Sequence, residues 1–228
     1  MSFKPALLVI DIQHDFLPGG SLAVVNGDDI IPGVLELLDF NKYNWKSVVF
    51  SQDWHPRDHT SFASNHANVK PFEKVSFTST KDPKVTSDET VWPDHCVQHS
   101  HGANFPDELI AAYKQIPVEK TIIQKGHLQD RDYYSAFNDI WDDDHTELGP
   151  FLKSQGITHV FVVGLAYDYC VKFTSASSAK LGFKTYVIKP LAKAIELDKL
   201  DQTDAYYRDH GVTIIESLDD DILKAVKK

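Results

Sequence analysis

The stretch Val160-Phe-Val-Val-Gly-Leu-Ala-Tyr-Asp-Tyr-Cys170 decides the fold, because it predicts a buried strand that turns directly into a helix. The apolar run 160–163 is typical of a strand inside a parallel sheet; Gly164 ends it, and helical spacing follows to residue 181. Cys170 should then lie at a helix N-terminus, where free N–H groups favour a thiolate and can hold an oxyanion. A cysteine beside a core strand is more often a small buried hydrophobe, so the rest of the chain must decide.

Short apolar runs elsewhere predict more strands of the same sheet, at residues 6–10, 47–51, 120–124, 184–188 and 212–215. Segments with helical spacing separate or follow them, at residues 30–38, 106–113, 148–154, 200–210 and 219–226. Strands that alternate with helices indicate an α/β fold with a parallel sheet. With 228 residues, the chain suits a single domain.

Composition excludes several classes of function. A net charge of −10 argues against nucleic acid or an anionic membrane as partner, and suits a small uncharged substrate. Two cysteines, Cys96 and Cys170, make a disulfide framework improbable and fit a reducing compartment. The apolar runs are too short to span a bilayer and no signal-like segment precedes the first strand, so we expect a cytoplasmic protein, with other intracellular compartments and homo-oligomers left open.

A long stretch without sustained periodicity, residues 54–105, holds six of the 11 histidines, which favours function over an idle linker. Asp53 lies just before this stretch and His55 near its start. Residues two apart in an extended chain point to the same side, so these two side chains could hold a cation. Further candidate ligands are His59, His95, His99 and His101, with His95 preferred because Trp92-Pro93 would bend the chain there. Histidine and aspartate ligands suggest zinc, iron or manganese.

Four strands end in reactive polar groups, namely Asp11, Asp53, Lys125 and Cys170. Ligands of an open parallel sheet bind at the carboxyl ends of its strands, so we expect these groups to meet. Asp11 could take the proton of the Cys170 thiol and pass one to departing ammonia, while Lys125 orients Asp11 and lowers the thiol pKa. The chemistry indicated is acyl transfer from an amide, with the oxyanion held by N–H groups of residues 166–170.

Several motifs together resemble the nicotinamidases of the isochorismatase-like cysteine hydrolases, the fungal members especially. They are Val-Ile-Asp11-Ile-Gln-His-Asp15-Phe16, Asp53-Trp-His55-Pro-x-x-His59-x-Ser-Phe, Trp92-Pro-x-His95-Cys96-Val, Lys125-Gly, Asp130-Arg-x-Tyr-Tyr134-Ser-Ala-Phe137 and Gly164-Leu-Ala-Tyr-Asp-Tyr-Cys170-Val. The match covers nearly the whole chain in the right order. It implies a three-layer α/β/α fold with a six-stranded parallel sheet, over one domain of residues 1–228 with a metal- and substrate-binding loop region at 54–105. The implied reaction converts nicotinamide, and close analogues such as pyrazinamide, to the acid and ammonia in NAD salvage.

The same resemblance assigns the site residues. It implies the triad Asp11, Lys125 and Cys170, the oxyanion donors Ala166 and Cys170, and the ligands Asp53, His55 and His95 of one divalent ion, foremost zinc, which would take the pyridine nitrogen. It places Phe16, Trp92, Tyr134, Ala166 and Tyr169 around the substrate, and Phe137 there or in the core. His59 ligates the metal in some relatives and only neighbours it in others, so we place it beside the metal. A cis peptide between Leu165 and Ala166 would aim the Ala166 N–H at the oxyanion.

Other readings stay open from the sequence. The same fold could cleave another small amide or an isochorismate-type vinyl ether, although the latter chemistry replaces the cysteine. The metal could activate water directly, with Cys170 dispensable. A module that only binds a small ligand or a partner would leave Asp11, Lys125 and Cys170 idle. Loss of ammonia release in Cys170→Ala would support a cysteine hydrolase, whereas substantial turnover would support a metal-activated water. Failure of the protein to release ammonia from nicotinamide would favour the binding module.

Overall fold

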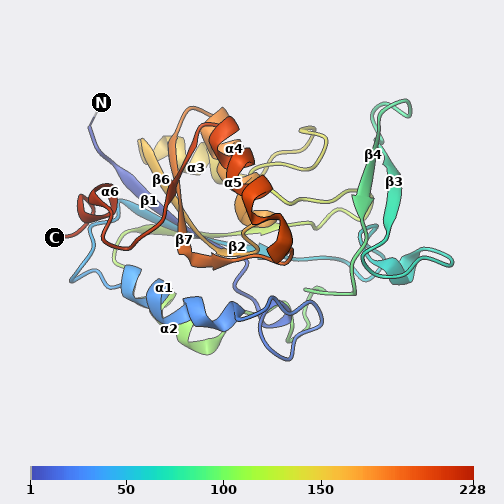
Figure 1. The fold of residues 1–228 in the computed structure, drawn as a ribbon, viewed down its shortest axis with the longest axis horizontal. Helices are drawn as coiled ribbons and strands as arrows, with labels where there is room; N and C mark the ends of the chain where they lie inside the picture. Colours follow the sequence, from blue (N-terminus) through green and yellow to red (C-terminus); the bar gives the residue numbers. More distant parts are fainter. Residues whose placement is uncertain (1) are drawn as a thin grey trace.

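A six-stranded parallel sheet runs through the middle of the structure, a computed structural model that describes residues 2–228 (Figure 1). In spatial order its strands are β5 (Glu119–Lys125), β2 (Ser47–Asp53), β1 (Pro5–Ile10), β6 (His159–Leu165), β7 (Lys184–Lys193) and β8 (Val212–Ile215). Every pair of neighbours is parallel. The α/β class and all six predicted strands are therefore confirmed. The strand order reverses between β1 and β6, which is where such sheets bind ligands.

Helices cover both faces of this sheet (Figure 1). One face carries α1 (Ile31–Leu37) and α2 (Asp107–Gln115), and the other carries α3 (Leu148–Ser154), α4 (Cys170–Lys180) and α5 (Leu200–Asp209). The last helix, α6 (Asp221–Lys224), is shorter than the 219–226 predicted, because the Asp220 side chain accepts the Ile222 N–H and starts the helix there. The remaining helices agree with the prediction to within a few residues.

The central strand β1 shows why the apolar runs are continuous rather than alternating. All six of its residues are buried. Leu7 and Val9 belong to the core beneath α1, whereas Leu8 and Ile10 belong to the core beneath α4. A strand covered on both faces needs apolar side chains at every position, which makes the run hydrophobic throughout. Such a strand delivers the residue after it, Asp11, into the interior at 0% exposure.

Gly164 brings the ends of β1 and β6 together. It has φ +122, and the pairing of β6 with β7 shifts register between Val162 and this residue. A Cβ on Gly164 would lie 2.1 Å from the carbonyl oxygen of Ile10, so no other residue fits without separating the two strands. The glycine therefore places the turn that carries Cys170 next to the end of β1.

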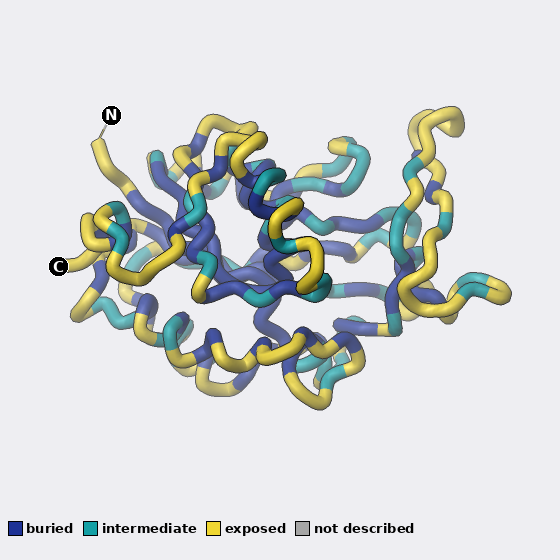
Figure 2. The backbone as a smooth tube through the Cα atoms, viewed as in Figure 1, coloured by how far each residue is buried: buried dark blue, intermediate teal, exposed yellow. Residues whose placement is uncertain are grey.

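The 54–105 region departs from the prediction. It contains an antiparallel hairpin, β3 (Lys74–Thr78) and β4 (Thr86–Thr90), that lies away from the main sheet (Figure 1). Most of the hairpin is exposed or half-buried (Figure 2). Phe77 is the one buried residue of its two strands. Polar and apolar residues alternate over the five residues of β3, but β4 has no apolar residue, so the sequence did not mark a pair of strands. None of the helices in residues 2–228 has the length and apolar character that a bilayer crossing needs.

Candidate active site

The ends of β1, β5 and β6 bring Asp11, Lys125 and Cys170 into direct contact. The Lys125 Nζ lies 2.9 Å from Asp11 Oδ2 and 3.4 Å from Cys170 Sγ. Asp11 and Lys125 are fully buried, and Cys170 is 8% exposed. The three residues predicted to act together are thus adjacent, although they are far apart along the chain.

A carboxylate oxygen of Asp11 lies within 4.8 Å of the Cys170 sulfur. Its Oδ1 accepts a hydrogen bond of 2.6 Å from the Ser51 hydroxyl. Its Oδ2 accepts no well-formed hydrogen bond from any group in residues 2–228, apart from the ion-pair contact with Lys125. Burial raises the pKa of the Asp11 carboxyl, and the negative charge of Asp53 adds to this, although Lys125 opposes both. A carboxylate with a raised pKa is a stronger base than an exposed aspartate, so Asp11 is suited to accept a proton from Cys170.

The electrostatics of Cys170 correct one expectation. We predicted that the helix N-terminus and Lys125 would favour a thiolate. Burial instead raises the pKa of the Cys170 thiol well above its usual value; the positive charge of Lys125 lowers it, but the negative charges of Asp11 and Asp53 raise it further. The resting group is therefore a thiol, whose proton must move as the sulfur attacks.

The turn between β6 and α4 offers two free backbone donors. The Leu165–Ala166 peptide is cis, as the resemblance implied. Within residues 2–228, no backbone carbonyl accepts the N–H of Ala166 or that of Cys170, while Ala166 O itself accepts the N–H groups of Tyr169 and Val171. Both donors flank the Cys170 side chain, so they can serve a negatively charged oxygen formed there.

Three candidate metal ligands also meet at this edge of the sheet. Donor atoms of Asp53, His55 and His95 all lie within 4.8 Å of one another. The Asp53 Oδ2 is 3.6 Å from His55 Nε2 and 3.9 Å from His95 Nε2. All three residues are buried.

Hydrogen bonds to backbone carbonyls fix the orientation of both imidazoles. The His55 Nδ1 lies 2.9 Å from Gly126 O, and the His95 Nδ1 lies 2.8 Å from Pro93 O. A carbonyl accepts only, so each Nδ1 donates its proton there and each Nε2 lies on the side of the Asp53 carboxylate. Burial lowers the pKa of His95 to about 4, which keeps it neutral. Burial lowers the pKa of His55 too, but the Asp53 carboxylate outweighs burial and raises it, so a bound metal would replace any proton on His55 Nε2. Two imidazoles and a carboxylate fit zinc, iron or manganese.

Asp53 links the two clusters. Its Oδ1 accepts a hydrogen bond of 2.5 Å from Lys125 Nζ, while Oδ2 faces the histidines. Its backbone is fixed by Gln13, whose side chain accepts the Asp53 N–H and donates to the Asp53 carbonyl. Burial would raise the pKa of Asp53, but the positive charges of Lys125 and His55 hold it well below its usual range. Asp53 therefore stays ionised beside Asp11, whose pKa it helps to raise.

The other predicted histidines lie outside this ligand set. His59 is buried beside His55, but its Nδ1 contacts the Ser61 hydroxyl at 2.7 Å and its Nε2 contacts Arg131 O at 2.9 Å. Both ring nitrogens are therefore in use. His99 packs edge-on against Trp54, and His101 stacks on His14.

A small cavity opens beside Cys170. The five residues predicted to surround a substrate all line it: Phe16, Trp92, Tyr134, Ala166 and Tyr169. Asp53, His95 and Cys170 line it too, so the candidate metal site and the thiol face one space. Phe137 does not; it is 3% exposed and packs in the core beneath α4.

Sequence reasoning missed several residues of this cavity, namely Leu22, Asp132, Tyr133 and Ile195. Asp132 is the most informative, because burial raises the pKa of its carboxyl to about 6. It stands at the unassigned position of the Asp130–Tyr134 motif, which was the available signal. Leu22 and Ile195 gave none, since isolated apolar residues in loops have no pattern.

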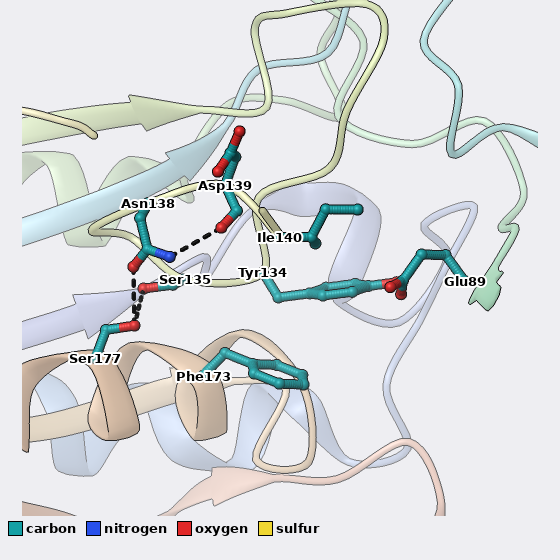
Figure 3. A pocket seen from close by; sticks show the side chains of 8 residues that line it. All are labelled: Glu89, Tyr134, Ser135, Asn138, Asp139, Ile140, Phe173 and Ser177. Carbon is teal, nitrogen blue, oxygen red and sulfur yellow. Dashed lines mark hydrogen bonds between the residues drawn. The ribbon is translucent and has the colours of Figure 1, made fainter. Parts of the chain in front are cut away.

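Tyr134 also lines a second cavity (Figure 3). Glu89, Asn138 and Phe173 are among the residues that line it. Its polar groups bond to one another: the Ser135 hydroxyl donates to Ser177 Oγ, which donates to Asn138 Oδ1. Tyr134 lines both cavities and separates this one from the thiol.

Comparison with known proteins places this geometry in a family. Residues 5–217 match the model of the isochorismatase domain. The nicotinamidase of Saccharomyces cerevisiae is 33% identical over 214 residues, which span 92% of this chain and 98% of the relative. The nicotinamidase of Acinetobacter baylyi is 38% identical over 193 residues, 85% of this chain and 83% of the relative.

Solved structures agree. The yeast nicotinamidase Pnc1p bound to the inhibitor nicotinaldehyde superimposes with a TM-score of 0.88 at 32% identity, over 93% of this chain and all of that one. A pyrazinamidase of Pyrococcus horikoshii in complex with zinc gives a TM-score of 0.71 at 29% identity, over 94% of this chain and 99% of that one. The similarity thus extends over nearly the whole sheet and its helices.

Proposed function

The chain belongs to the isochorismatase family and is an amidohydrolase, and from this premise we propose that it converts nicotinamide to nicotinate and ammonia in NAD salvage. The observation that carries the proposal is the contact of Asp11, Lys125 and Cys170 in a cavity that also holds a candidate metal site. We also propose that residues 1–228 form one domain, which the family match over 5–217 supports. Pyrazinamide, a close analogue, should be a second substrate.

Cys170 is the proposed nucleophile. Its thiol proton passes to Asp11 Oδ2 as the sulfur bonds to the carboxamide carbon, and the carbonyl electron pair moves onto the oxygen. The N–H groups of Ala166 and Cys170 bind that oxyanion, with each such donor worth about 3 kcal/mol. Asp11 then returns the proton to the nitrogen, the C–N bond breaks, and ammonia leaves a thioester on Cys170.

Water completes the cycle. Asp11, again a carboxylate, removes a proton from the water molecule that attacks the thioester, and the thiolate that departs regains a proton from Asp11. Lys125 remains charged throughout, because Asp11 and Asp53 raise its pKa well above the usual value despite its burial. It keeps Asp11 aligned and stabilises negative charge on the sulfur at 3.4 Å.

Asp53, His55 and His95 are the residues that would hold the metal. When bound there, a divalent ion supplies a Lewis acid for the pyridine nitrogen and fixes the ring relative to Cys170. Phe16, Trp92, Tyr134 and Tyr169 enclose the flat ring from the other sides of the cavity. The zinc-bound pyrazinamidase is similar enough to make zinc the first candidate, with iron and manganese as alternatives.

Ammonia release tests the proposal, with nicotinamide, pyrazinamide and benzamide as substrates and metal analysis of the same sample. We expect turnover of the first two and little of benzamide, which lacks the ring nitrogen. Cys170→Ala should lose at least about a thousandfold in kcat while it keeps its metal. Cys96→Ala is the matched control, since Cys96 is also buried and unpaired but lies outside the cavity.

Two results would contradict the proposal. Wild-type protein with metal that releases no ammonia from nicotinamide would remove the substrate assignment. Substantial turnover by Cys170→Ala would instead favour direct attack by a metal-activated water.

A further inference from the structure

A row of aromatic side chains runs from the substrate cavity to α5. Trp92 meets Tyr169 edge-on with ring centroids 4.9 Å apart, and Tyr169 lies 5.7 Å from Tyr134. Tyr134 and Phe173 lie next to each other (Figure 3), stacked with ring centroids 5.3 Å apart and an interplanar angle of 24°. Phe173 meets the edge of Tyr206 at 5.9 Å. Three of the five rings, those of Trp92, Tyr134 and Tyr169, line the cavity. The wall of the cavity is therefore continuous with an aromatic cluster outside it.

One cation contacts three rings of this row. The Lys172 Nζ lies 5.5 Å from the centroid of Tyr169, 4.7 Å from that of Phe173 and 5.2 Å from that of Tyr206. Lys172 and Phe173 belong to the first turn of α4, Tyr169 directly precedes that helix, and Tyr206 belongs to α5. The Lys172 ammonium thus contacts both Tyr169, which precedes the nucleophile, and Tyr206 of α5.

No ion pair holds this ammonium in place. Lys172 is half-buried, and no carboxylate in residues 2–228 forms a salt bridge with it. Burial lowers the pKa of Lys172, whereas the more distant charges of Asp168 and Glu196 raise it. Partial burial removes water from the ammonium, which costs free energy when no ion pair is formed. The faces of the aromatic rings offset this desolvation cost through cation–π contacts.

We propose that Lys172 is a positioning residue for the hydrolysis of nicotinamide, holding the Tyr169 ring directly and the Tyr134 ring through Phe173. The inference rests on the proposed function. Lys172 touches neither the reacting atoms nor the metal ligands, so its effect is exerted through the two tyrosines that enclose the substrate ring. Without the cation these rings are less constrained, and the substrate must order them when it binds.

This role predicts which kinetic constant changes. The tyrosines contact the ring equally before and during the chemical step, so a looser wall weakens uniform binding. Loss of uniform binding raises KM and leaves kcat unchanged. A purely structural role would lower thermal stability and the fraction of active enzyme without moving KM.

The test compares Lys172→Met and Lys172→Arg in the full-length, metal-loaded protein. We expect KM for nicotinamide to rise about five- to tenfold in Lys172→Met with kcat within about twofold, because partly buried cation–π contacts have about this strength. Arginine keeps the cation over the rings, so Lys172→Arg should stay within about twofold of wild type. Lys180→Met is the matched control on α4, since Lys180 is exposed and pairs with Asp142.

Phe173→Leu gives a second route to the same answer if Lys172→Met fails to fold. It removes the ring between Lys172 and Tyr134, so it should also raise KM selectively. Wild-type KM in either variant, a fall in kcat alone, or an equal loss in Lys172→Arg would overturn the inference. Wild-type protein that hydrolyses no nicotinamide would instead overturn the proposed function, so the two failures are distinguishable.

Discussion

Lys125 concentrates the electrostatics of the site in one side chain. Its ammonium is fully buried and contacts the carboxylates of Asp11 and Asp53 as well as the sulfur of Cys170. One positive charge is thus shared by two negative ones. The Asp53 carboxyl takes most of the stabilisation and has a lowered pKa, whereas that of Asp11 is raised by burial. This asymmetry makes one aspartate a permanent anion and the other a base.

The first prediction concerns the pH dependence that follows from Asp11. Asp11 must be ionised to accept the proton of the Cys170 thiol. We therefore expect kcat/KM to rise as the pH increases through the Asp11 pKa. Because burial raises that pKa, the acidic limb should lie above the value of an exposed aspartate. The measurement is kcat/KM for nicotinamide between pH 4 and pH 9, at saturating metal.

Asp132 provides the comparison, because its pKa of about 6 could produce a similar limb. Asp11→Asn should lower kcat/KM about a hundredfold or more and abolish the limb. Asp132→Asn should keep it. If Asp132→Asn lost the acidic limb and Asp11→Asn kept it, Asp132 rather than Asp11 would be the titrating base.

At the scale of elements, strand ends were predictable and loop contributions were not. The central strands β1, β2 and β6 are buried at every position. Their apolar runs, with the shorter runs of β5, β7 and β8, marked the sheet and placed Asp11, Asp53 and Lys125 at one edge. In the hairpin, β4 has no apolar residue, so the short alternation of β3 had no partner strand in the sequence. The thiol pKa was predicted with the wrong sign because burial, which only the structure shows, outweighs the helix N-terminus.

The loop after β5 carries the second prediction. Gly126 has φ +69, and a Cβ there would lie 2.3 Å from His55 Cε1, while its carbonyl accepts the His55 Nδ1–H. Gly126→Ala should displace the imidazole and weaken metal affinity about 10- to 100-fold, as loss of a partner that orients a ligand commonly does. Competition with a chromophoric zinc chelator measures this affinity.

Gly211→Ala separates displacement of His55 from backbone strain. Gly211 has φ +73, but nothing lies within 4 Å of the position of its Cβ. This variant should lose about 1–2 kcal/mol of unfolding free energy and keep wild-type metal affinity. Equal metal affinity in the two variants would refute the role given to Gly126.

At the scale of the whole molecule, the two cores and the site are different regions of one sheet. The apolar clusters lie above and below the strands, whereas the ligands gather beyond the carboxyl ends of β1, β2 and β5. The hydrophobic cores therefore do not depend on the metal. Metal binding adds to the stability of a sheet that is already packed.

Removal of the metal gives the third prediction. Chelation should leave a folded protein whose Tm is lower by about 10 °C, since a ligand at a thousand times its Kd adds about 4 kcal/mol and 1 kcal/mol corresponds to about 2–4 °C at this size. Zinc should restore both Tm and ammonia release. Differential scanning calorimetry before and after chelation measures the shift. An unchanged Tm with full activity after verified metal loss would exclude the ligand set Asp53, His55 and His95.

The central claim is that hydrolysis proceeds through a thioester on Cys170, and partitioning with hydroxylamine tests it most directly. Nicotinamide and methyl nicotinate would give the same nicotinoyl thioester, which water and hydroxylamine then divide. We predict hydroxamate and nicotinate in the same ratio from both substrates at a given hydroxylamine concentration. Different ratios, or no hydroxamate from either, would mean that the acyl group never resides on Cys170.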